Sequence, residues 1–295
     1  MNTEKLKGTG VAIVTPFTTH GDIDFVSLER LLEHLIKGGV EYLVVQGTTG
    51  ESVTMTDQER MVLFSFVREK VDGRVGLVAG VGGNDTMKTA KQMKAFDLEG
   101  YQAILSVTPY YNKPTQEGLY RHFAYLAEHT PLPIILYNVP GRTAVNLLPE
   151  TTLRLAKGFS NIIGIKEASG NVEQIMQIIM HKPKGFLVIS GDDNLTMPLV
   201  AAGAVGVISV VANVFPQQYS DMVRASLAGD LVHARKLHYS LMDLTNLLFA
   251  EGNPAGAKAA LQLLGICEAT VRLPLVEASE TLTNRIVEQI KVLQF

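Results

Sequence analysis

Eight short runs of apolar, largely β-branched residues recur along the chain, and this repetition restricts the fold more than any other feature. The runs lie at Val11–Val14, Tyr42–Val45, Val75–Ala79, Ala103–Val107, Ile134–Tyr137, Ile162–Ile165, Phe186–Ile189 and Gly206–Val210. Between them the chain shows helical periodicity, as in the segment Leu28–Ile36, whose leucines and isoleucine fall on one helical face. Each predicted strand is therefore followed by a predicted helix.

The spacing and composition of these runs favour a closed barrel. Successive runs start roughly 20 to 33 residues apart, which is the length of one parallel crossover unit. The runs are almost continuously apolar, as expected for strands that are buried on both faces. Eight such units predict an α/β fold, a (β/α)8 TIM barrel. An open, doubly wound sheet has the same local alternation and stays the alternative, but the count of eight favours the barrel.

Helix-end signals support this division, and helices alone follow the last strand. Thr56 and Glu59 form a capping box, Pro149 suits a first helical turn, and Gly38–Gly39 can end the first helix. After residue 215 the strand pattern stops, and four helical stretches follow: Pro216–Leu227, Leu231–Phe249, Pro254–Leu264 and Glu280–Leu293. We expect a barrel catalytic domain over residues 1–225 and a C-terminal helical appendage over 226–295, packed on the barrel because no linker separates them.

Charge, hydropathy and cysteine content exclude several kinds of partner. Lysine and arginine total 26 against 29 aspartates and glutamates, a net charge of −3 without blocks of like charge, which argues against nucleic acid. The longest apolar stretch, residues 204–215, is far shorter than the roughly 18 residues of a membrane span. The single cysteine, Cys267, cannot form an internal disulfide and suits a reducing compartment. We therefore expect a cytoplasmic protein with no membrane partner.

The loop after the second run, Gly47–Glu51, reads GTTGE and precedes a predicted helix. Glycines allow close approach of the backbone, and the amides and hydroxyls of such a loop can bind a carboxylate or phosphate. The same composition is also typical of a tight strand-to-helix turn, so the motif alone does not decide between the two.

The sixth run continues into Lys166 and Glu167, at the end of the barrel where active sites of this fold lie. Side chains alternate along a strand, so one of these two residues points into the barrel and the other toward the helices. A lysine desolvated inside the barrel would provide a neutral amine that attacks a carbonyl group and forms a Schiff base. The alternative is a lysine that pairs structurally with a carboxylate.

Two neighbouring strands place further candidate groups at the same rim. The fifth run ends in Tyr137, whose phenol can relay protons or fill the core, and is followed by Arg142, which can bind a substrate carboxylate or pair with a protein carboxylate. The fourth is followed by Tyr110 and Tyr111, a pair more typical of an interface than of catalysis.

No pattern in the sequence indicates a cofactor or a metal. The seven histidines have no ligand spacing, and neither a P-loop nor a dinucleotide fingerprint is present. The glycines at 80–83 lack the acidic partner of a nucleotide site. We therefore expect no cofactor and no metal.

Taken together, the motifs resemble those of the dihydrodipicolinate synthase family of pyruvate-dependent class I aldolases, which is closely related to N-acetylneuraminate lyases. The resemblance covers nearly the whole chain and includes Gly47–Glu51, Thr108–Asn112, Ile135–Pro140, Gly164–Ala168, Ser190–Asp193 and Gly206–Ser209. It implies a Schiff-base lyase that condenses pyruvate with L-aspartate 4-semialdehyde to 4-hydroxy-tetrahydrodipicolinate in lysine and diaminopimelate biosynthesis.

The resemblance also implies roles for individual residues. Lys166 would form the imine with pyruvate, and Thr49, Tyr111 and Tyr137 would form a proton relay. Tyr111 would reach in from a neighbouring subunit of a homotetramer that is a dimer of dimers. The pyruvate site would be formed by Thr48, Thr49, Gly191 and Ile208.

Arg142 distinguishes this family from related sugar aldolases. An arginine just after the Tyr-Asn-Val-Pro run would bind the semialdehyde carboxylate, whereas a sugar aldolase must recognise hydroxyl groups. Two alternatives remain: an aldolase for a sugar-derived 2-keto acid, and an inactive barrel that only binds a keto acid or a partner. The presence of Lys166, Tyr137 and the threonine pair argues against the inactive barrel.

One set of positions departs from lysine-inhibited relatives. By resemblance the inhibitor site corresponds to Ser52, Val53, Asp57, Arg60, Asn84, Lys88 and Tyr110. Arg60 and Lys88 stand where those relatives have a histidine and a glutamate, and two added cations should repel the ammonium groups of lysine. We therefore expect weak feedback inhibition or none.

Overall fold

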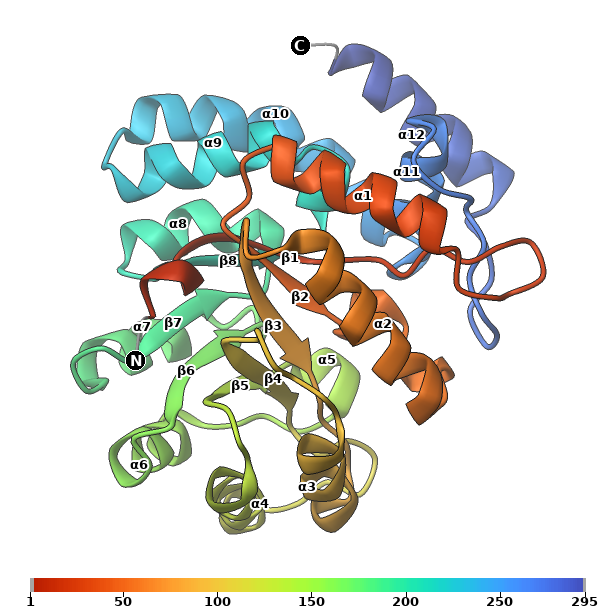
Figure 1. The fold of residues 1–295 in the computed structure, drawn as a ribbon. Helices are drawn as coiled ribbons and strands as arrows, with labels where there is room; N and C mark the ends of the chain where they lie inside the picture. Colours follow the sequence, from red (N-terminus) through yellow and green to blue (C-terminus); the bar gives the residue numbers. More distant parts are fainter. Residues whose placement is uncertain (1–2, 294–295) are drawn as a thin grey trace.

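Eight parallel strands close into a barrel in the computed structural model, which describes residues 3–293 (Figure 1). The barrel closes where β1 pairs with β8, with Gly8 opposite Gly206. The strands are β1 (Gly8–Ala12), β2 (Tyr42–Val45), β3 (Gly76–Gly80), β4 (Ala103–Val107), β5 (Ile134–Asn138), β6 (Ile162–Glu167), β7 (Leu187–Ser190) and β8 (Gly206–Ser209). The predicted (β/α)8 barrel is confirmed, and the open sheet is wrong.

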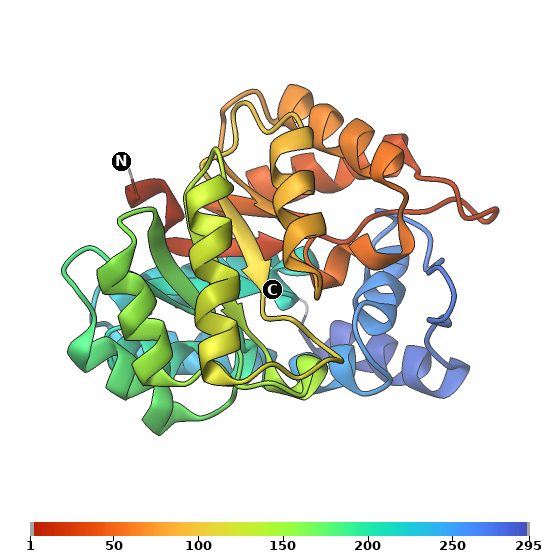
Figure 2. The same cartoon turned by 90° about the horizontal axis from the view of Figure 1, so that it is seen from below.

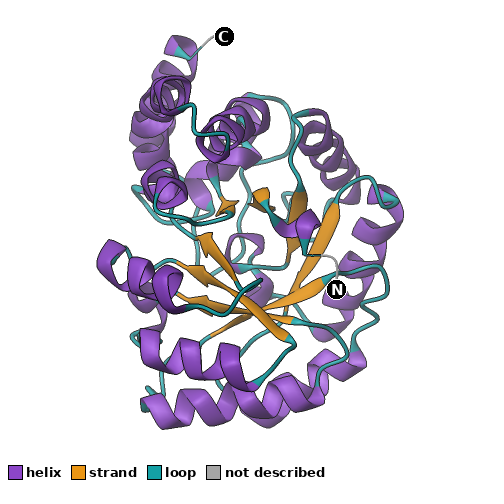
Figure 3. Ribbon diagram, turned by 90° about the vertical axis from the view of Figure 1, so that its left-hand side faces the viewer, coloured by secondary structure: helices purple, strands orange, loops and turns teal. Residues whose placement is uncertain are grey.

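Helices surround the strands on all sides (Figure 3). The α-helices are α1 (Phe25–Lys37), α2 (Asp57–Val71), α3 (Thr86–Ala95), α4 (Gln116–His129), α5 (Pro140–Thr143), α6 (Pro149–Gly158), α7 (Val172–His181), α8 (Thr196–Ala201), α9 (Pro216–Leu227), α10 (Leu231–Phe249), α11 (Ala255–Leu263) and α12 (Glu280–Val292). Short 3₁₀ turns are η1 (Glu4–Leu6), η2 (Thr48–Gly50), η3 (Ser52–Thr54), η4 (Asp193–Leu195) and η5 (Val211–Asn213). No helix within residues 3–293 has the length and apolar character needed to cross a bilayer.

The predicted helix ends are confirmed. The Thr56 hydroxyl accepts a hydrogen bond from the backbone N–H of Glu59, and the Glu59 carboxylate accepts one from the Thr56 N–H, so both halves of the capping box are present. Pro149 opens α6, and Gly38 caps the C-terminus of α1.

Six of the eight strands differ from their predicted bounds by one to three residues, and the differences in β1 and β6 matter most for the site. β1 starts at Gly8 instead of Val11. The start was missed because Gly8 and Gly10 give no strand signal in the sequence, although Gly10 has a packing role. A Cβ atom on Gly10 would lie 2.2 Å from the ring of Tyr42, which fills the barrel interior. β6 extends to Glu167, so Lys166 lies within the regular strand and not after it.

The apolar residues form two separate clusters, as expected for a barrel. The larger one lies between strands and helices. The smaller one fills the interior and contains Leu6, Ala12, Tyr42, Val44, Val78, Ala103, Leu105, Ile135, Tyr137, Val139, Ile163, Leu187, Ile189 and Ile208. Some residues of the inner cluster lie near the carboxyl ends of their strands. These residues therefore lie just inside the mouth of the barrel.

The C-terminal helices pack on one side of the barrel. α9 contacts β1, β8, α1 and α8, so it completes the barrel repeat, while α10, α11 and α12 contact one another. Figures 1 and 2 place α11 and α12 on the side of α1 and α2. The domain division between residues 225 and 226 stays a prediction; it falls within α9, which ends at Leu227.

Candidate active site

Lys166 and Tyr137 lie side by side at the carboxyl ends of β6 and β5. The two residues are paired in register, and the Lys166 Nζ atom lies 4.5 Å from the centroid of the Tyr137 ring. Lys166 is only 5% exposed, and Tyr137 belongs to the inner cluster. The strand thus directs the lysine into the barrel, where its amine is largely removed from water.

The next residue, Glu167, points the other way, toward the helices. Its carboxylate accepts hydrogen bonds from the Asn138 amide at 2.6 Å, the Gln174 amide at 2.9 Å and the Ser169 hydroxyl. Burial raises the pKa of Glu167, and these hydrogen bonds act in the opposite direction. The network ties β5, β6 and α7 together behind Lys166 and fixes the strand that carries the lysine.

Gly191 leaves space beside the Lys166 side chain. A Cβ atom at this position would lie 2.6 Å from the Ala168 Cβ atom and 3.0 Å from the Lys166 Cε atom. Any larger residue would therefore press on the lysine. Ile208, the other residue predicted to line the pocket, is buried on β8 in the inner cluster.

The two threonines of the loop after β2 have different surroundings. Thr48 lines a cleft at the barrel mouth. Thr49 is buried, and its hydroxyl accepts a hydrogen bond of 2.9 Å from the amide of Asn253, which lies between α10 and α11. The predicted substrate loop is therefore held partly by the C-terminal region.

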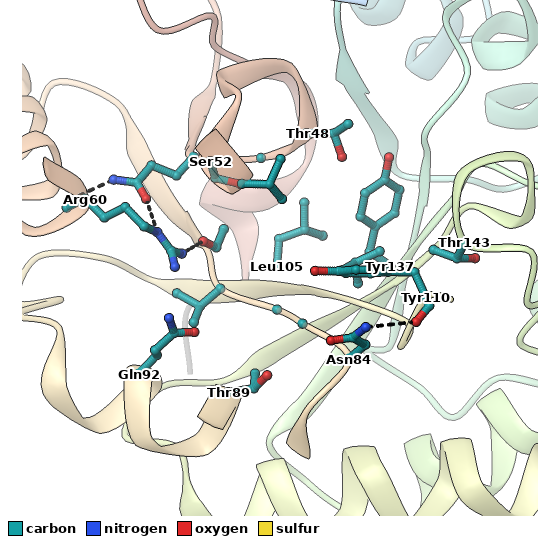
Figure 4. Close-up of a pocket in the computed structure, with 18 of the residues that line it drawn as sticks. Thr48, Ser52, Arg60, Asn84, Thr89, Gln92, Leu105, Tyr110, Tyr137 and Thr143 are labelled. Atoms are coloured by element: carbon teal, nitrogen blue, oxygen red, sulfur yellow. Dashed lines mark hydrogen bonds between the residues drawn. The ribbon is translucent and has the colours of Figure 1, made fainter. Parts of the chain in front are cut away.

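The cleft has a volume of about 490 Å³ and opens at the barrel mouth. Thr48, Tyr137 and Arg142 line it, and Figure 4 shows Thr48 and Tyr137 at one end and Arg60 at the other. Arg142 is exposed and lies in the short helix α5. Tyr137 borders both the cleft and Lys166, so it connects the open space with the buried amine.

Tyr111 does not join the site of its own subunit. Its side chain is 88% exposed, and it is not among the residues that line the cleft. Its backbone has a φ of +72°, an uncommon conformation for a residue other than glycine. Tyr110, next to it, does line the cleft, where its backbone carbonyl accepts a hydrogen bond from Asn84.

The seven positions assigned to the inhibitor site come together in the same cleft. All line it: Ser52, Val53, Asp57, Arg60, Asn84, Lys88 and Tyr110. The Arg60 guanidinium is buried and donates hydrogen bonds to the Gln46 side chain at 2.6 Å and the Gly80 carbonyl at 3.0 Å. One of its nitrogens also lies 3.9 Å from the Asp57 carboxylate. Burial lowers the pKa of Arg60, although Asp57 acts in the opposite direction.

A pair of charges that the sequence analysis missed lies behind the threonine loop. The Lys258 ammonium on α11 donates a hydrogen bond of 2.7 Å to the Glu51 carboxylate, and both side chains are fully buried. The second oxygen of Glu51 accepts a hydrogen bond from the backbone N–H of Arg272. Burial lowers the pKa of Lys258, and the Glu51 carboxylate opposes this shift. The pair anchors α11 to the end of the GTTGE loop.

Among residues 3–293, no three His, Cys, Asp or Glu side chains gather as a set of metal ligands. The arrangement offers a buried amine, a phenol beside it and a hydroxyl-rich loop near by. A (β/α)8 barrel with these groups at the ends of its strands is typical of the imine-forming, class I aldolases.

Comparison with known proteins gives the family within this class. Residues 5–293 match the model of the dihydrodipicolinate synthetase family, and the chain belongs to this family. It is 52% identical over 279 residues to a 4-hydroxy-tetrahydrodipicolinate synthase of Flavobacterium psychrophilum, covering 95% of each chain. It is also 52% identical to such a synthase of Parabacteroides distasonis, with 92% and 91% covered.

Solved structures agree with this result. The crystal structure of dihydrodipicolinate synthase from Thermotoga maritima matches with a TM-score of 0.95 and 46% identity, covering 97% of this chain and 98% of that one. A monomeric variant of dihydrodipicolinate synthase matches with a TM-score of 0.95 and 45% identity, covering 98% of this chain and 97% of the other. The resemblance seen in the sequence motifs is thereby confirmed.

Proposed function

We propose that this chain condenses pyruvate with L-aspartate 4-semialdehyde to give 4-hydroxy-tetrahydrodipicolinate, in the biosynthesis of diaminopimelate and lysine. Membership of the dihydrodipicolinate synthetase family supports the activity, and the buried Lys166 beside Tyr137 is the observation that carries the mechanism. The enzyme acts in the cytoplasm, where its one cysteine, the buried Cys267, stays reduced.

The reaction begins on the Lys166 amine. The amine attacks the C2 carbonyl of pyruvate, and the carbinolamine loses water to form an imine. A proton leaves the methyl carbon, and the resulting enamine carbon attacks the aldehyde of the second substrate, whose oxygen takes up a proton. The amino group of that substrate then attacks the imine carbon, which closes the ring and releases Lys166 as the free amine.

These steps move protons to and from oxygen atoms above Lys166, and hydroxyl groups suit this work because they both donate and accept. We assign the relay to Tyr137, Thr49 and Tyr111, with Tyr111 supplied by a second subunit. Thr48 is a further candidate, since it lines the cleft with Tyr137 whereas the Thr49 hydroxyl is buried against Asn253. Thr48, Thr49, Gly191 and Ile208 form the pyruvate site, and the two threonines hold its carboxylate.

Arg142 selects the second substrate. It is exposed on the cleft wall, and no hydrogen bond or ion pair within residues 3–293 occupies its guanidinium, so it is available to a carboxylate. We expect pyruvate to be consumed with the semialdehyde and not with N-acetylmannosamine. Arg142→Ala should raise the KM for the semialdehyde at least tenfold and lower kcat, because a charge-assisted hydrogen bond contributes about 1.5–3 kcal/mol.

Steady-state kinetics with each substrate varied in turn checks this prediction, and the KM for pyruvate serves as the internal control. Turnover with the sugar alone would keep the imine chemistry and move the enzyme to the lyase branch. An Arg142→Ala variant with unchanged kinetics would mean that a different residue recognises the second substrate.

The active unit is a dimer at least, and we propose a homotetramer that is a dimer of dimers. The exposed Tyr111 supports this proposal, because a phenol needed at the site lies outside the cleft of its own subunit. The fold alone does not fix the assembly, since a monomeric synthase variant has nearly the same structure. Sedimentation velocity of the purified protein measures the number of subunits directly.

Mixing two inactive variants tests whether Tyr111 acts across subunits. Lys166→Ala and Tyr111→Phe should each be nearly inactive, but subunits exchanged in equal amounts should recover about a quarter of the wild-type activity. Half of randomly mixed dimers contain both variants, and each of these has one intact site out of two. If Tyr111 served its own subunit, the mixture would stay inactive.

Feedback inhibition by lysine should be weak or absent. Arg60 and Lys88 line the cleft region that corresponds to the inhibitor site, and the Arg60 guanidinium is already held by Gln46 and Gly80. Their positive charges oppose binding of an amino acid with two ammonium groups. We expect initial rates at millimolar lysine to stay within about twofold of the uninhibited rate, and strong inhibition at that concentration would refute the prediction.

A further inference from the structure

Asn253 is buried next to the proposed substrate loop although it lies 204 residues away along the chain. It is 6% exposed, and its amide nitrogen donates a hydrogen bond of 2.9 Å to the hydroxyl oxygen of Thr49. The other end of the amide, Oδ1, is buried without a hydrogen-bond partner among the described residues. Thr49 is thus the partner of its side chain in the part of the chain that the structure describes.

A buried amide with only half of its hydrogen-bonding capacity used is unfavourable for folding. Buried polar atoms without partners are uncommon in native proteins, and they deserve a functional explanation where they occur beside a site. Packing alone does not explain an amide here, since an apolar side chain of similar volume would fill the same space without leaving a polar atom unpaired.

We propose that Asn253 is a positioning residue that orients the hydroxyl of Thr49 toward bound pyruvate. This inference rests on the role of Thr49 proposed above. A threonine hydroxyl has one proton to donate and lone pairs to accept with. When the Asn253 amide donates to the oxygen, the proton of Thr49 points elsewhere and is available to the substrate carboxylate or to a relay oxygen.

The surroundings hold Asn253 firmly enough for this role. It lies two residues before the start of α11. The buried Lys258 on α11 donates a hydrogen bond to Glu51, two residues after Thr49. A Cβ atom on Gly256 would lie 2.6 Å from the Leu248 carbonyl, so α11 packs closely on the end of α10. The C-terminal region therefore supplies a fixed donor to the loop that follows β2.

The isosteric change Asn253→Asp tests the direction of this hydrogen bond. An ionised carboxylate only accepts, so it would draw the Thr49 proton toward itself and away from the substrate. At pH 8 we expect kcat/KM for pyruvate to fall roughly 10- to 100-fold, mainly through KM, the loss expected for a hydrogen bond to a charged group. Imine trapping with borohydride should then need correspondingly more pyruvate.

The pH dependence of the Asn253→Asp variant distinguishes a positioning role from a purely structural one. Position 253 is only 6% exposed, and burial raises the pKa of a carboxyl group placed there. A protonated carboxyl can donate as the amide does, so the ratio of variant to wild-type kcat/KM should recover as pH falls from 8 toward 6. The matched control is Asn161→Asp, because the Asn161 amide donates to the Ala127 carbonyl just before β6 begins, at the opposite end of that strand from Lys166. Its ratio to wild type should not depend on pH.

A double-mutant cycle shows whether Asn253 acts through Thr49. Thr49→Val removes the hydroxyl, so adding Asn253→Ala to it should change kcat/KM for pyruvate less than twofold, although Asn253→Ala alone lowers it at least tenfold. Additive losses, or a pH-independent ratio for Asn253→Asp, would overturn the inference. Wild-type kinetics of Thr49→Val would instead refute the role of Thr49 itself.

Circular dichroism and thermal unfolding of each variant identify those that fail to fold. Asn253→Ser, which keeps a donor, should retain more activity than Asn253→Ala.

Discussion

Lys166→Ala should lose kcat by about four orders of magnitude or more, the scale expected when a covalent nucleophile is removed. The variant should fold normally, because alanine fits a position that is already surrounded by the inner cluster and leaves no buried charge. Treatment of the wild type with pyruvate and borohydride should add one reduced pyruvyl group per subunit. Intact-protein mass spectrometry and peptide mapping should find that group on Lys166 and should find none in the variant.

A second lysine provides the matched control for this experiment. Lys182 is partly buried, and its ammonium donates a hydrogen bond to the Phe186 carbonyl just before β7, at the other end of the barrel. Lys182→Ala should keep both the activity and the adduct. An adduct on any lysine other than Lys166, or an active Lys166→Ala enzyme, would contradict the proposed mechanism. A wild-type protein that shows neither an adduct nor turnover would favour the alternative of an inactive barrel.

The sequence predicted the parts of the molecule that depend on local patterns. Most strands are buried on both faces and largely apolar, so they appear as short runs, and the helices between them have their own periodicity and caps. Lys166 was found because it breaks such a run at the end where active sites of this fold lie. The two glycines of β1 carry no such pattern, and the start of that strand was therefore missed.

The inward direction of Lys166 needed the register of the barrel. Alternation predicted that Lys166 and Glu167 point to opposite sides, but a shift of one residue would have exchanged them. The pairing of Tyr137 with Lys166 settles this orientation, and the hydrogen-bond donors around the Glu167 carboxylate fit the outer side. A lone loop arginine such as Arg142 likewise gained meaning only from the cleft that it lines.

Contacts between distant segments could not be predicted from one sequence. Asn253 and Lys258 meet Thr49 and Glu51 across more than 200 residues, and no local period relates these positions. One signal was available, since Lys258 is the single charge within the mostly apolar segment 254–264. A charge in such a segment indicates a buried ion pair or a functional lysine, but only the fold identifies its partner.

The same ion pair leads to the prediction with the largest effect on stability. Lys258→Met should lower the free energy of unfolding by about 3–5 kcal/mol, because it leaves the fully buried Glu51 carboxylate without its counter-charge. The backbone N–H of Arg272 still donates to Glu51 but cannot neutralise it. Denaturant unfolding of the wild type and the variant at equal protein concentration measures the change in the free energy of unfolding. Neither sample should contain substrate, because a ligand that binds the folded state raises its apparent stability.

Two further variants separate the lost pair from the lost side chain. Lys291→Met removes a lysine from an exposed pair with Glu288, whose side chains are 61% and 73% exposed, and should change stability by less than about 1 kcal/mol. Adding Glu51→Gln to Lys258→Met removes the unpaired charge and should recover part of the loss, since replacing both partners of a buried pair costs less than replacing one. If the double variant were instead less stable than Lys258→Met, the two charges would not be coupled. Packing, and not the ion pair, would then hold α11 to the threonine loop.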